Sequence, residues 1–213
     1  MLTPSVNKTT YYWLLAASLL LLAVIIYIVF ITGNTTLDEE VFGFIGPHRT
    51  AGRTSLMKSV SLLANHNFLI PANMLFIIYF VTRKNKWGAI TVATVALSSL
   101  ALMSLLKNVI GRHRPAEPLV QGITNYSFPS GHAFMGVVFY GLLIGWAATV
   151  INNKWQRRIV ISFFIALLLL IGFSRIYLRV HYTTDVLAGF SIGITWLLLS
   201  LQIMKMAEIK YTR

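Results

Sequence analysis

The amino-acid sequence predicts an all-α fold: a polytopic integral membrane protein with six transmembrane helices. Composition is the first observation behind this prediction, because 56% of the 213 residues are hydrophobic and only 11% are charged. A soluble domain carries about 25% charged residues, so this chain has too few polar side chains to cover a surface that faces water. The mean hydropathy is +0.71. The second observation is that the apolar residues form runs of about 20 residues, long enough to cross a bilayer.

Six apolar runs are the expected spans. The first covers residues 11–32, and no A-x-A cleavage site follows it, which favours a retained span over a signal peptide. The second lies within the uncharged stretch 59–82, whose most apolar part is 68–81 and contains Pro71. The remaining spans are expected at residues 87–106, 134–151, 159–173 and 186–204. We expect residues 1–213 to form a single membrane-embedded domain.

The segment between the first two spans, residues 37–58, mixes acidic and apolar side chains before it becomes basic. Such a mixture is typical of a short interfacial helix that lies on the membrane surface. An ordinary solvated loop is the other interpretation. The residues that make up the mixture are Asp38, Glu39, Glu40, Val41, Phe42, Phe44 and Ile45.

Charge and cysteine content exclude several classes of protein. The net charge is +12, but the bases stand in short clusters between uncharged runs, whereas a nucleic-acid-binding protein carries a basic face on a soluble fold. No nucleic-acid partner is therefore expected. The same composition excludes a disordered chain, a coiled coil and collagen. Without cysteine there is no disulfide framework and no thiolate nucleophile.

The basic residues also predict an orientation. Ten of them fall on one side if both termini are cytoplasmic, and eight fall on the other side. Five of those eight belong to two loops that also carry histidines; if these five serve chemistry, the bias becomes ten against three. We therefore expect a plasma-membrane protein with an extracytoplasmic active site. The five residues are Lys107, Arg112, Arg114, Arg175 and Arg179.

Ionisable residues gather in three short segments at one set of span ends. They are residues 107–115 after the third span, 129–132 before the fourth, and 174–185 between the fifth and sixth. A charged side chain near the bilayer centre costs about 3 kcal/mol on insertion scales, so charges close to the spans indicate function.

The second segment and the bases around it can form a phosphate pocket. Arg114 and Arg175 carry guanidinium groups that match phosphate oxygens bidentately, and Lys107 adds a point charge. Ser130 is a favourable N-cap residue, and Gly131 lets the backbone approach a ligand closely. A helix that begins here would bind an anion through its free N–H groups.

Two histidines and an aspartate supply reactive groups. His181 and Asp185 stand four residues apart, which would bring them to one face of a helix. The carboxylate would fix the imidazole tautomer and leave the other ring nitrogen free as a nucleophile or base. His132, from another helix, could protonate a leaving oxygen.

Each of these residues, taken singly, also has a structural interpretation. A histidine at a helix end is more often a hydrogen-bonded structural residue, and Asp185 could cap the sixth span. Lys107 could simply end the third span, while Arg175 and Arg179 could anchor a helix at the bilayer edge. Their joint occurrence at one membrane face favours the functional interpretation.

Together the three segments resemble the tripartite signature of the type 2 phosphatidic acid phosphatases. The pattern reads Lys107-x6-Arg114-Pro115, then Pro129-Ser130-Gly131-His132, then Ser174-Arg175-x5-His181-x3-Asp185. All eleven signature residues are present with the spacing of the family, between residues 107 and 185. Within the family the chain looks most like bacterial phosphatidylglycerophosphatase B and undecaprenyl pyrophosphate phosphatases.

The resemblance implies a role for each signature residue. His181 would attack phosphorus to give a phosphohistidine, Asp185 would orient it, and His132 would be the general acid. Phosphoryl oxygens would be held by Lys107, Arg114, Ser130, Gly131 and Arg175. Family members need neither metal nor cofactor. The implied substrate is a phosphorylated membrane lipid, either phosphatidylglycerophosphate or undecaprenyl pyrophosphate, with phosphatidic acid and diacylglycerol pyrophosphate as further possibilities.

A carrier that binds phosphorylated lipid or anion without hydrolysis is the alternative function. Transporters, however, usually place their sites near the midplane within inverted repeats, and no repeat is visible here. In the loop that joins the third and fourth spans, Glu117, Tyr126 and Phe128 are either gate or head-group residues or ordinary loop residues. The physiological lipid and the oligomeric state are not predicted.

Overall fold

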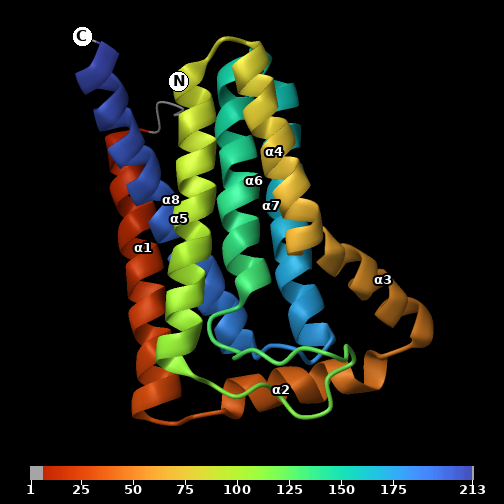
Figure 1. Ribbon diagram of the computed structural model, residues 1–213. Coiled ribbons are helices and arrows are strands. Elements are labelled where there is room, and N and C mark those ends of the chain that lie inside the picture. The colour runs from red at the N-terminus through yellow and green to blue at the C-terminus, as the bar shows by residue number, and fades with distance from the viewer. Residues whose placement is uncertain (1–6, 213) are drawn as a thin grey trace.

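Six helical segments in the described part of the chain are long and apolar enough to cross a membrane, as the sequence predicted (Figure 1). The computed structural model describes residues 7–212, which form helices and connecting loops. The first span is α1 (Lys8–Ile26), prolonged by the π-helical turn η1 (Tyr27–Ile31). The later spans are α5 (Lys86–Ile110), α6 (Gly131–Val150), α7 (Lys154–Tyr177) and α8 (Thr183–Thr212).

The second span differs from the sequence prediction because it consists of two helices. It begins at Ala51 rather than near residue 59, with α3 (Ala51–Leu62) followed by α4 (His66–Thr82). Asn65 ends the turn between them, and its side chain accepts a hydrogen bond from the Asn67 N–H at 3.0 Å as the N-cap of α4. Figure 1 shows α3 leaving the direction of α4 at this break. The bases Arg53 and Lys58 lie on α3, so a search for uncharged runs misses its start.

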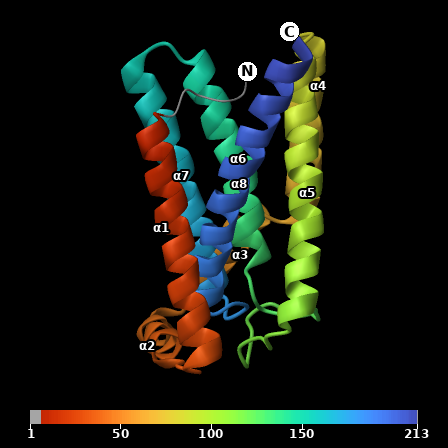
Figure 2. The same cartoon turned by 90° about the vertical axis from the view of Figure 1, so that its left-hand side faces the viewer.

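A short helix, α2 (Thr36–Ile45), lies across one end of the bundle and is followed by the 3₁₀ turn η2 (Gly46–His48) (Figures 1 and 2). The helical interpretation of this segment is therefore confirmed. Val41, Phe42 and Ile45 pack with Leu178 and Val180 in the connection between α7 and α8. One face of α2 is thus fixed to the bundle while Phe44, 75% exposed, points away from it.

Helix α6 occupies the middle of the bundle and packs against α5, α7 and α8, while α1 packs on α8 and α4 on α5 (Figure 2). Glycines on α8 permit the close approach of α6. A Cβ atom at Gly189 would lie 2.6 Å from the Ser130 carbonyl oxygen, and one at Gly193 would lie 3.1 Å from the Phe134 carbonyl oxygen. Small residues of this kind let membrane helices pack backbone against backbone. The first turns of α6 and α8 consequently lie side by side, and the Ser130 N–H donates to the Asp185 carbonyl at 3.0 Å.

The three signature segments meet at the end of the bundle that α2 covers, whereas both described chain ends lie at the opposite end (Figure 1). Backbone hydrogen bonds fix the long α5–α6 loop there. The Ser127 N–H donates to the Arg112 carbonyl at 2.8 Å, and the Leu119 N–H donates to the Leu178 carbonyl at 2.9 Å. Through these bonds the loop holds the first signature segment, residues 107–115, beside the third, residues 174–185.

Candidate active site

His181 and Asp185 lie together, but not in the way the sequence suggested. Helix α8 begins at Thr183, so His181 precedes the helix and does not share a helical face with Asp185. The Asp185 side chain reaches back and accepts the Tyr182 N–H at 2.9 Å. Its Oδ2 lies 3.5 Å from Nδ1 of His181. Asp185 is the third residue of α8 and not its N-cap, but its carboxylate both binds the backbone N–H that precedes the helix and faces His181.

Asp185 is fully buried, and its charge is compensated from two further segments. The Ser127 hydroxyl donates to Oδ2, and Nη1 of Arg112 donates to Oδ1 at 2.6 Å. A buried carboxylate is tolerated only when it is paired and hydrogen-bonded, and here both oxygens have donors. The plane of the carboxylate is consequently fixed with one oxygen toward the imidazole.

The His181 ring is 2% exposed and lies between this carboxylate and a guanidinium group. Its Nε2 is 3.3 Å from Nη1 of Arg114. Burial lowers the pKa of His181 to about 4, and the neighbouring Asp185 carboxylate offsets only part of that effect. The imidazole is therefore neutral near pH 7. With its proton on Nδ1, facing Asp185, the Nε2 lone pair is directed toward the cavity side.

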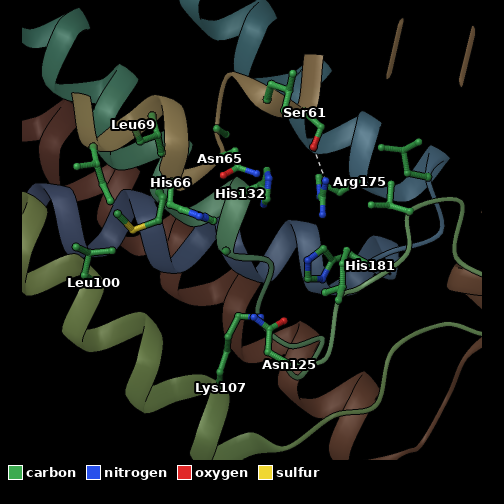
Figure 3. A pocket seen from close by; sticks show the side chains of 18 of the residues that line it. Ser61, Asn65, His66, Leu69, Leu100, Lys107, Asn125, His132, Arg175 and His181 are labelled. Carbon is green, nitrogen blue, oxygen red and sulfur yellow. Dashed lines mark hydrogen bonds between the residues drawn. The ribbon is translucent and has the colours of Figure 1, made fainter. Parts of the chain in front are cut away.

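His132 lies in the first turn of α6, on the other side of the same cavity from His181 (Figure 3). Ser130 is the N-cap of α6, as predicted, and its hydroxyl accepts the Ala133 N–H at 3.5 Å. The free N–H groups of this helix end favour an anion between the two histidines.

The three cationic side chains predicted for the site reach the cavity from different elements, and Lys58 of α3 also lines it. Lys107, near the end of α5, donates to the Tyr126 carbonyl at 2.6 Å, and Arg175, near the end of α7, donates to the Ser61 hydroxyl. Arg175 is 5% exposed, which is inconsistent with an anchor at the bilayer edge. Its Nε is buried without a hydrogen-bond partner in the part of the chain that the structure describes.

Arg114 is held by the loop that faces it. Its guanidinium donates to the Asn125 side-chain oxygen at 2.5 Å, to the Asn125 carbonyl at 2.7 Å and to the Val180 carbonyl. Burial lowers the pKa of Arg114 from its usual value, but arginine stays charged. These contacts aim a permanent positive charge at His181.

The cavity that these groups line has a volume of about 1010 Å³ and two chemically different parts. Of the eight predicted site residues, Lys107, Arg114, Gly131, His132, Arg175 and His181 line it; Asp185 lies behind His181, and Ser130 caps α6. The other part runs between α4 and α5 and is lined by apolar side chains. Several of these are also about half exposed or more on the outside of the bundle, so the cavity opens sideways: Ile70 (49%), Met74 (58%) and Leu97 (67%).

The α5–α6 loop contributes to the cavity through residues 119–125 rather than through the three residues considered from the sequence. Phe128 is 1% exposed and packs edge-on against Phe30, so its role is structural. Glu117 lies 3.3 Å from Arg179 in an exposed ion pair. Tyr126 contributes its backbone carbonyl to Lys107 and Arg114.

Sequence reasoning assigned no role in the site to Asp38, Ser61 and Ser127, and it named Arg112 only as one of the five bases set aside for chemistry. Arg112 and Ser127 contact Asp185, Ser61 contacts Arg175, and Asp38 contacts Arg112. One signal for Asp38 was present, because it precedes Val41, Phe42 and Ile45 by three, four and seven residues. An acid on the apolar stripe of an amphipathic helix is buried when that stripe packs.

The fold and the cavity define a class: multi-pass helical membrane proteins with a cationic pocket that opens toward the bilayer. Residues 87–209, more than half of the chain, match the PAP2 superfamily, and the chain belongs to this family. It is therefore a PAP2-type membrane lipid phosphatase, a phosphoric monoester hydrolase, as the three signature segments predicted.

Named relatives and solved structures agree with this assignment. The chain is 31% identical to phosphatidylglycerophosphatase B of Bacillus subtilis over 65% of its length and 69% of the relative. It is also 31% identical to undecaprenyl-diphosphatase of Sulfolobus acidocaldarius, over 86% of the chain and 87% of the relative.

Among structures, the transmembrane PAP2-type phosphatidylglycerolphosphate phosphatase of Bacillus subtilis superposes with a TM-score of 0.78, at 25% identity, over 92% of this chain and 96% of that one. The fold is also that of Aquifex aeolicus LpxE, with a TM-score of 0.61 at 24% identity, over 78% of this chain and 95% of that one.

Proposed function

We propose that this phosphatase removes phosphate monoester or pyrophosphate head groups from membrane lipids. Its substrates are phosphatidylglycerophosphate, converted to phosphatidylglycerol, and undecaprenyl pyrophosphate, converted to undecaprenyl phosphate. The names of the two relatives support these lipids. The observation that carries the chemistry is that His181 and His132 line one cavity together with Lys107, Arg114 and Arg175. Family membership favours hydrolysis over the carrier function.

The first step is nucleophilic attack at phosphorus. Nε2 of neutral His181 donates its electron pair to phosphorus while the bond from phosphorus to the leaving oxygen breaks, giving phosphohistidine and a lipid oxygen that takes its proton from His132. The Nδ1 proton faces Asp185, which stabilises the positive charge that develops on the imidazole. Lys107, Arg114, Arg175 and the N–H groups at Gly131 stabilise the phosphoryl oxygens.

The second step returns the enzyme to its starting state. His132, now neutral, takes a proton from water, and the hydroxide attacks phosphorus while the bond to Nε2 breaks, releasing inorganic phosphate. Cationic side chains and a helix N-terminus supply the charge stabilisation, so we propose that the reaction needs no metal ion.

We also propose that the protein lies in the plasma membrane with both termini cytoplasmic and the cavity on the extracytoplasmic side. Four of the five bases set aside in the charge count are engaged at the site: Lys107, Arg114 and Arg175 line the cavity, and Arg112 pairs with Asp185. Arg179 instead forms an exposed ion pair with Glu117, so the positive-inside bias becomes ten against four.

Phosphate release by detergent-purified protein in excess chelator tests the mechanism. His181→Ala should lower the rate by about three orders of magnitude or more, because the nucleophile is lost. His48→Ala, at an exposed histidine whose ring bonds to the Phe44 carbonyl of the preceding helix, is the matched control and should behave as wild type. Loss of activity with chelator alone, or retained activity in His181→Ala, would contradict the proposal.

Two further measurements separate the parts of the proposal. Acid-labile, base-stable phosphate trapped on the wild-type protein and absent from His181→Ala would support the covalent intermediate. Turnover of phosphatidylglycerophosphate, undecaprenyl pyrophosphate, phosphatidic acid and diacylglycerol pyrophosphate at equal surface dilution ranks the substrates. Preference for either of the last two would overturn the substrate assignment and leave the mechanism intact.

A further inference from the structure

A buried carboxylate on α2 is connected to the catalytic aspartate through a single arginine. Asp38 is 1% exposed although it belongs to the short helix at the end of the bundle. Its Oδ1 accepts the Thr184 N–H at 2.9 Å, and its Oδ2 accepts the Thr184 hydroxyl at 2.8 Å and Nη2 of Arg112 at 3.1 Å. Asp38 therefore satisfies a backbone donor in the first turn of α8, one residue before Asp185.

Arg112 bridges two carboxylates that come from helices far apart in the sequence. While Nη2 faces Asp38, Nη1 donates to Oδ1 of Asp185 at 2.6 Å and to the Thr184 hydroxyl at 2.8 Å. Its Cζ lies 4.1 Å from the centre of the Tyr182 ring, so the guanidinium also stacks on an aromatic face. The side chain is 13% exposed, and its planar fork leaves little freedom to either carboxylate.

We propose that Asp38 and Arg112 are positioning residues that hold Asp185, and through it His181, in the geometry for attack on phosphorus. The inference rests on the proposed roles of His181 and Asp185. Neither Asp38 nor Arg112 is among the eight site residues that the signature supplies, and neither lines the cavity. They act on the reaction only through Asp185.

The physical reason is that Asp185 has to meet several donors at once. Its Oδ2 receives the Ser127 hydroxyl and the Tyr182 N–H and also faces Nδ1 of His181, so a small rotation of the carboxylate would exchange these partners. Arg112 fixes Oδ1 and thereby sets that rotation. An unpaired arginine would swing toward water, and Asp38 prevents this by holding its second nitrogen. A displacement of about 1 Å at a nucleophile can lower a rate by about 100-fold.

Exposed residues of the same charge provide matched control substitutions for Asp38 and Arg112. Glu40 stands on the same helix two residues later and is exposed, so Glu40→Gln removes the same charge without touching the network. For Arg112, the matched control is Arg53→Gln, an exposed arginine on α3 whose guanidinium contacts the His48 carbonyl. Both controls should keep wild-type kcat.

The experiment measures kcat and KM of the purified full-length chain on short-chain phosphatidic acid. We expect Asp38→Asn and Arg112→Gln to lower kcat by about 10- to 100-fold with KM within about twofold of wild type. Arg112→Lys keeps the charge but cannot reach both carboxylates with one nitrogen, so it should restore part of the rate. Thr184→Val, which keeps side-chain size and removes the shared hydroxyl, should give a smaller loss. Single-turnover trapping should place the slower step at phosphohistidine formation.

Active-site titration by phosphohistidine trapping gives the fraction of competent enzyme, and tryptophan fluorescence gives Tm. Wild-type kcat in folded Asp38→Asn and Arg112→Gln would overturn the proposal. So would a raised KM at unchanged kcat, which would mean a role in binding. A fall in rate that only matches a lower competent fraction would mean a structural role and would overturn it as well. If His181→Ala retains turnover, the proposed mechanism fails instead, which distinguishes the two failures.

Discussion

At the scale of single residues, the site depends on opposite charges placed on the two sides of one buried ring. Asp185 lies on the Nδ1 side of His181 and Arg114 on the Nε2 side, 3.5 Å and 3.3 Å away respectively. Besides burial, the positive charges of Arg114 and Arg175 disfavour protonation of this ring. Proton loss from Nε2 is therefore already complete before substrate arrives, and no separate base has to activate the nucleophile.

This arrangement predicts the acid side of the pH–rate profile. The pKa of His181 is lowered from 6.5 to about 4, so kcat/KM should stay high as pH falls through 6 and should drop about tenfold per pH unit below 4, where Nε2 becomes protonated. A phosphate monoester also titrates near pH 6, so its ionisation has to be measured by phosphorus NMR and divided out. An acid limb that remains centred near 6.5 after this correction would contradict the predicted His181 environment.

At the scale of elements, close contact between α6 and α8 brings His132 to the segment that carries His181. Gly189 makes this contact possible, because a Cβ there would lie 2.6 Å from the Ser130 carbonyl oxygen and 2.9 Å from the Cβ of Ala133. The atoms in the way belong to the backbone and to an alanine, which cannot rotate out of the way. The helix pair is therefore sensitive to a single methyl group.

Gly189→Ala should lower the free energy of unfolding by about 1–3 kcal/mol and reduce turnover, because α8 has to move away from the cap of α6. The measurement is Tm by tryptophan fluorescence in detergent, with phosphate release beside it. Gly43→Ala on α2 is the control, since a Cβ at Gly43 would meet nothing within 4 Å. Equal Tm values for the two variants would show that the α6–α8 contact is not close enough to matter.

The sequence predicted the spans and most of the site because both are encoded locally. Long uncharged runs identify helices such as α5, and the spacing within each signature segment identifies Lys107 or His181 without knowledge of the fold. Asp38 could not be paired by the same reasoning, since Arg112 is 74 residues away and only tertiary packing joins them. The observed helix boundaries differ from the predicted ones where a helix contains a charged residue, as α3 contains Lys58 and α7 contains Arg175.

At the scale of the whole molecule, the proposed catalytic residues and the described chain ends lie at opposite ends of the helical bundle. The polar cavity residues come from helix ends and loops at the α2 end, and the described ends of α1 and α8 lie at the other (Figure 1). The loop between α6 and α7 is also at that far end. A membrane protein built in this way presents its substrate site to one compartment and its termini to the other.

The chain contains no cysteine, so the proposed orientation can be tested with single-cysteine variants. Glu40→Cys on α2 should react with a membrane-impermeant maleimide in intact cells, because the proposed orientation places α2 outside. Lys154→Cys, at the start of α7, should react only after permeabilisation. The wild-type chain supplies an unlabelled background. Labelling with the opposite pattern would reverse the orientation.

The sideways opening between α4 and α5 would let a lipid enter the cavity directly from the bilayer. Its hydrocarbon chains would then lie among Ile70, Met74 and Leu97 and would not pass through water. The encounter with the enzyme then takes place in two dimensions, so the rate should follow the mole fraction of substrate in the surface rather than its amount per unit volume. Doubling inert lipid or detergent at fixed substrate should slow the enzyme, whereas diluting the whole suspension with buffer should not.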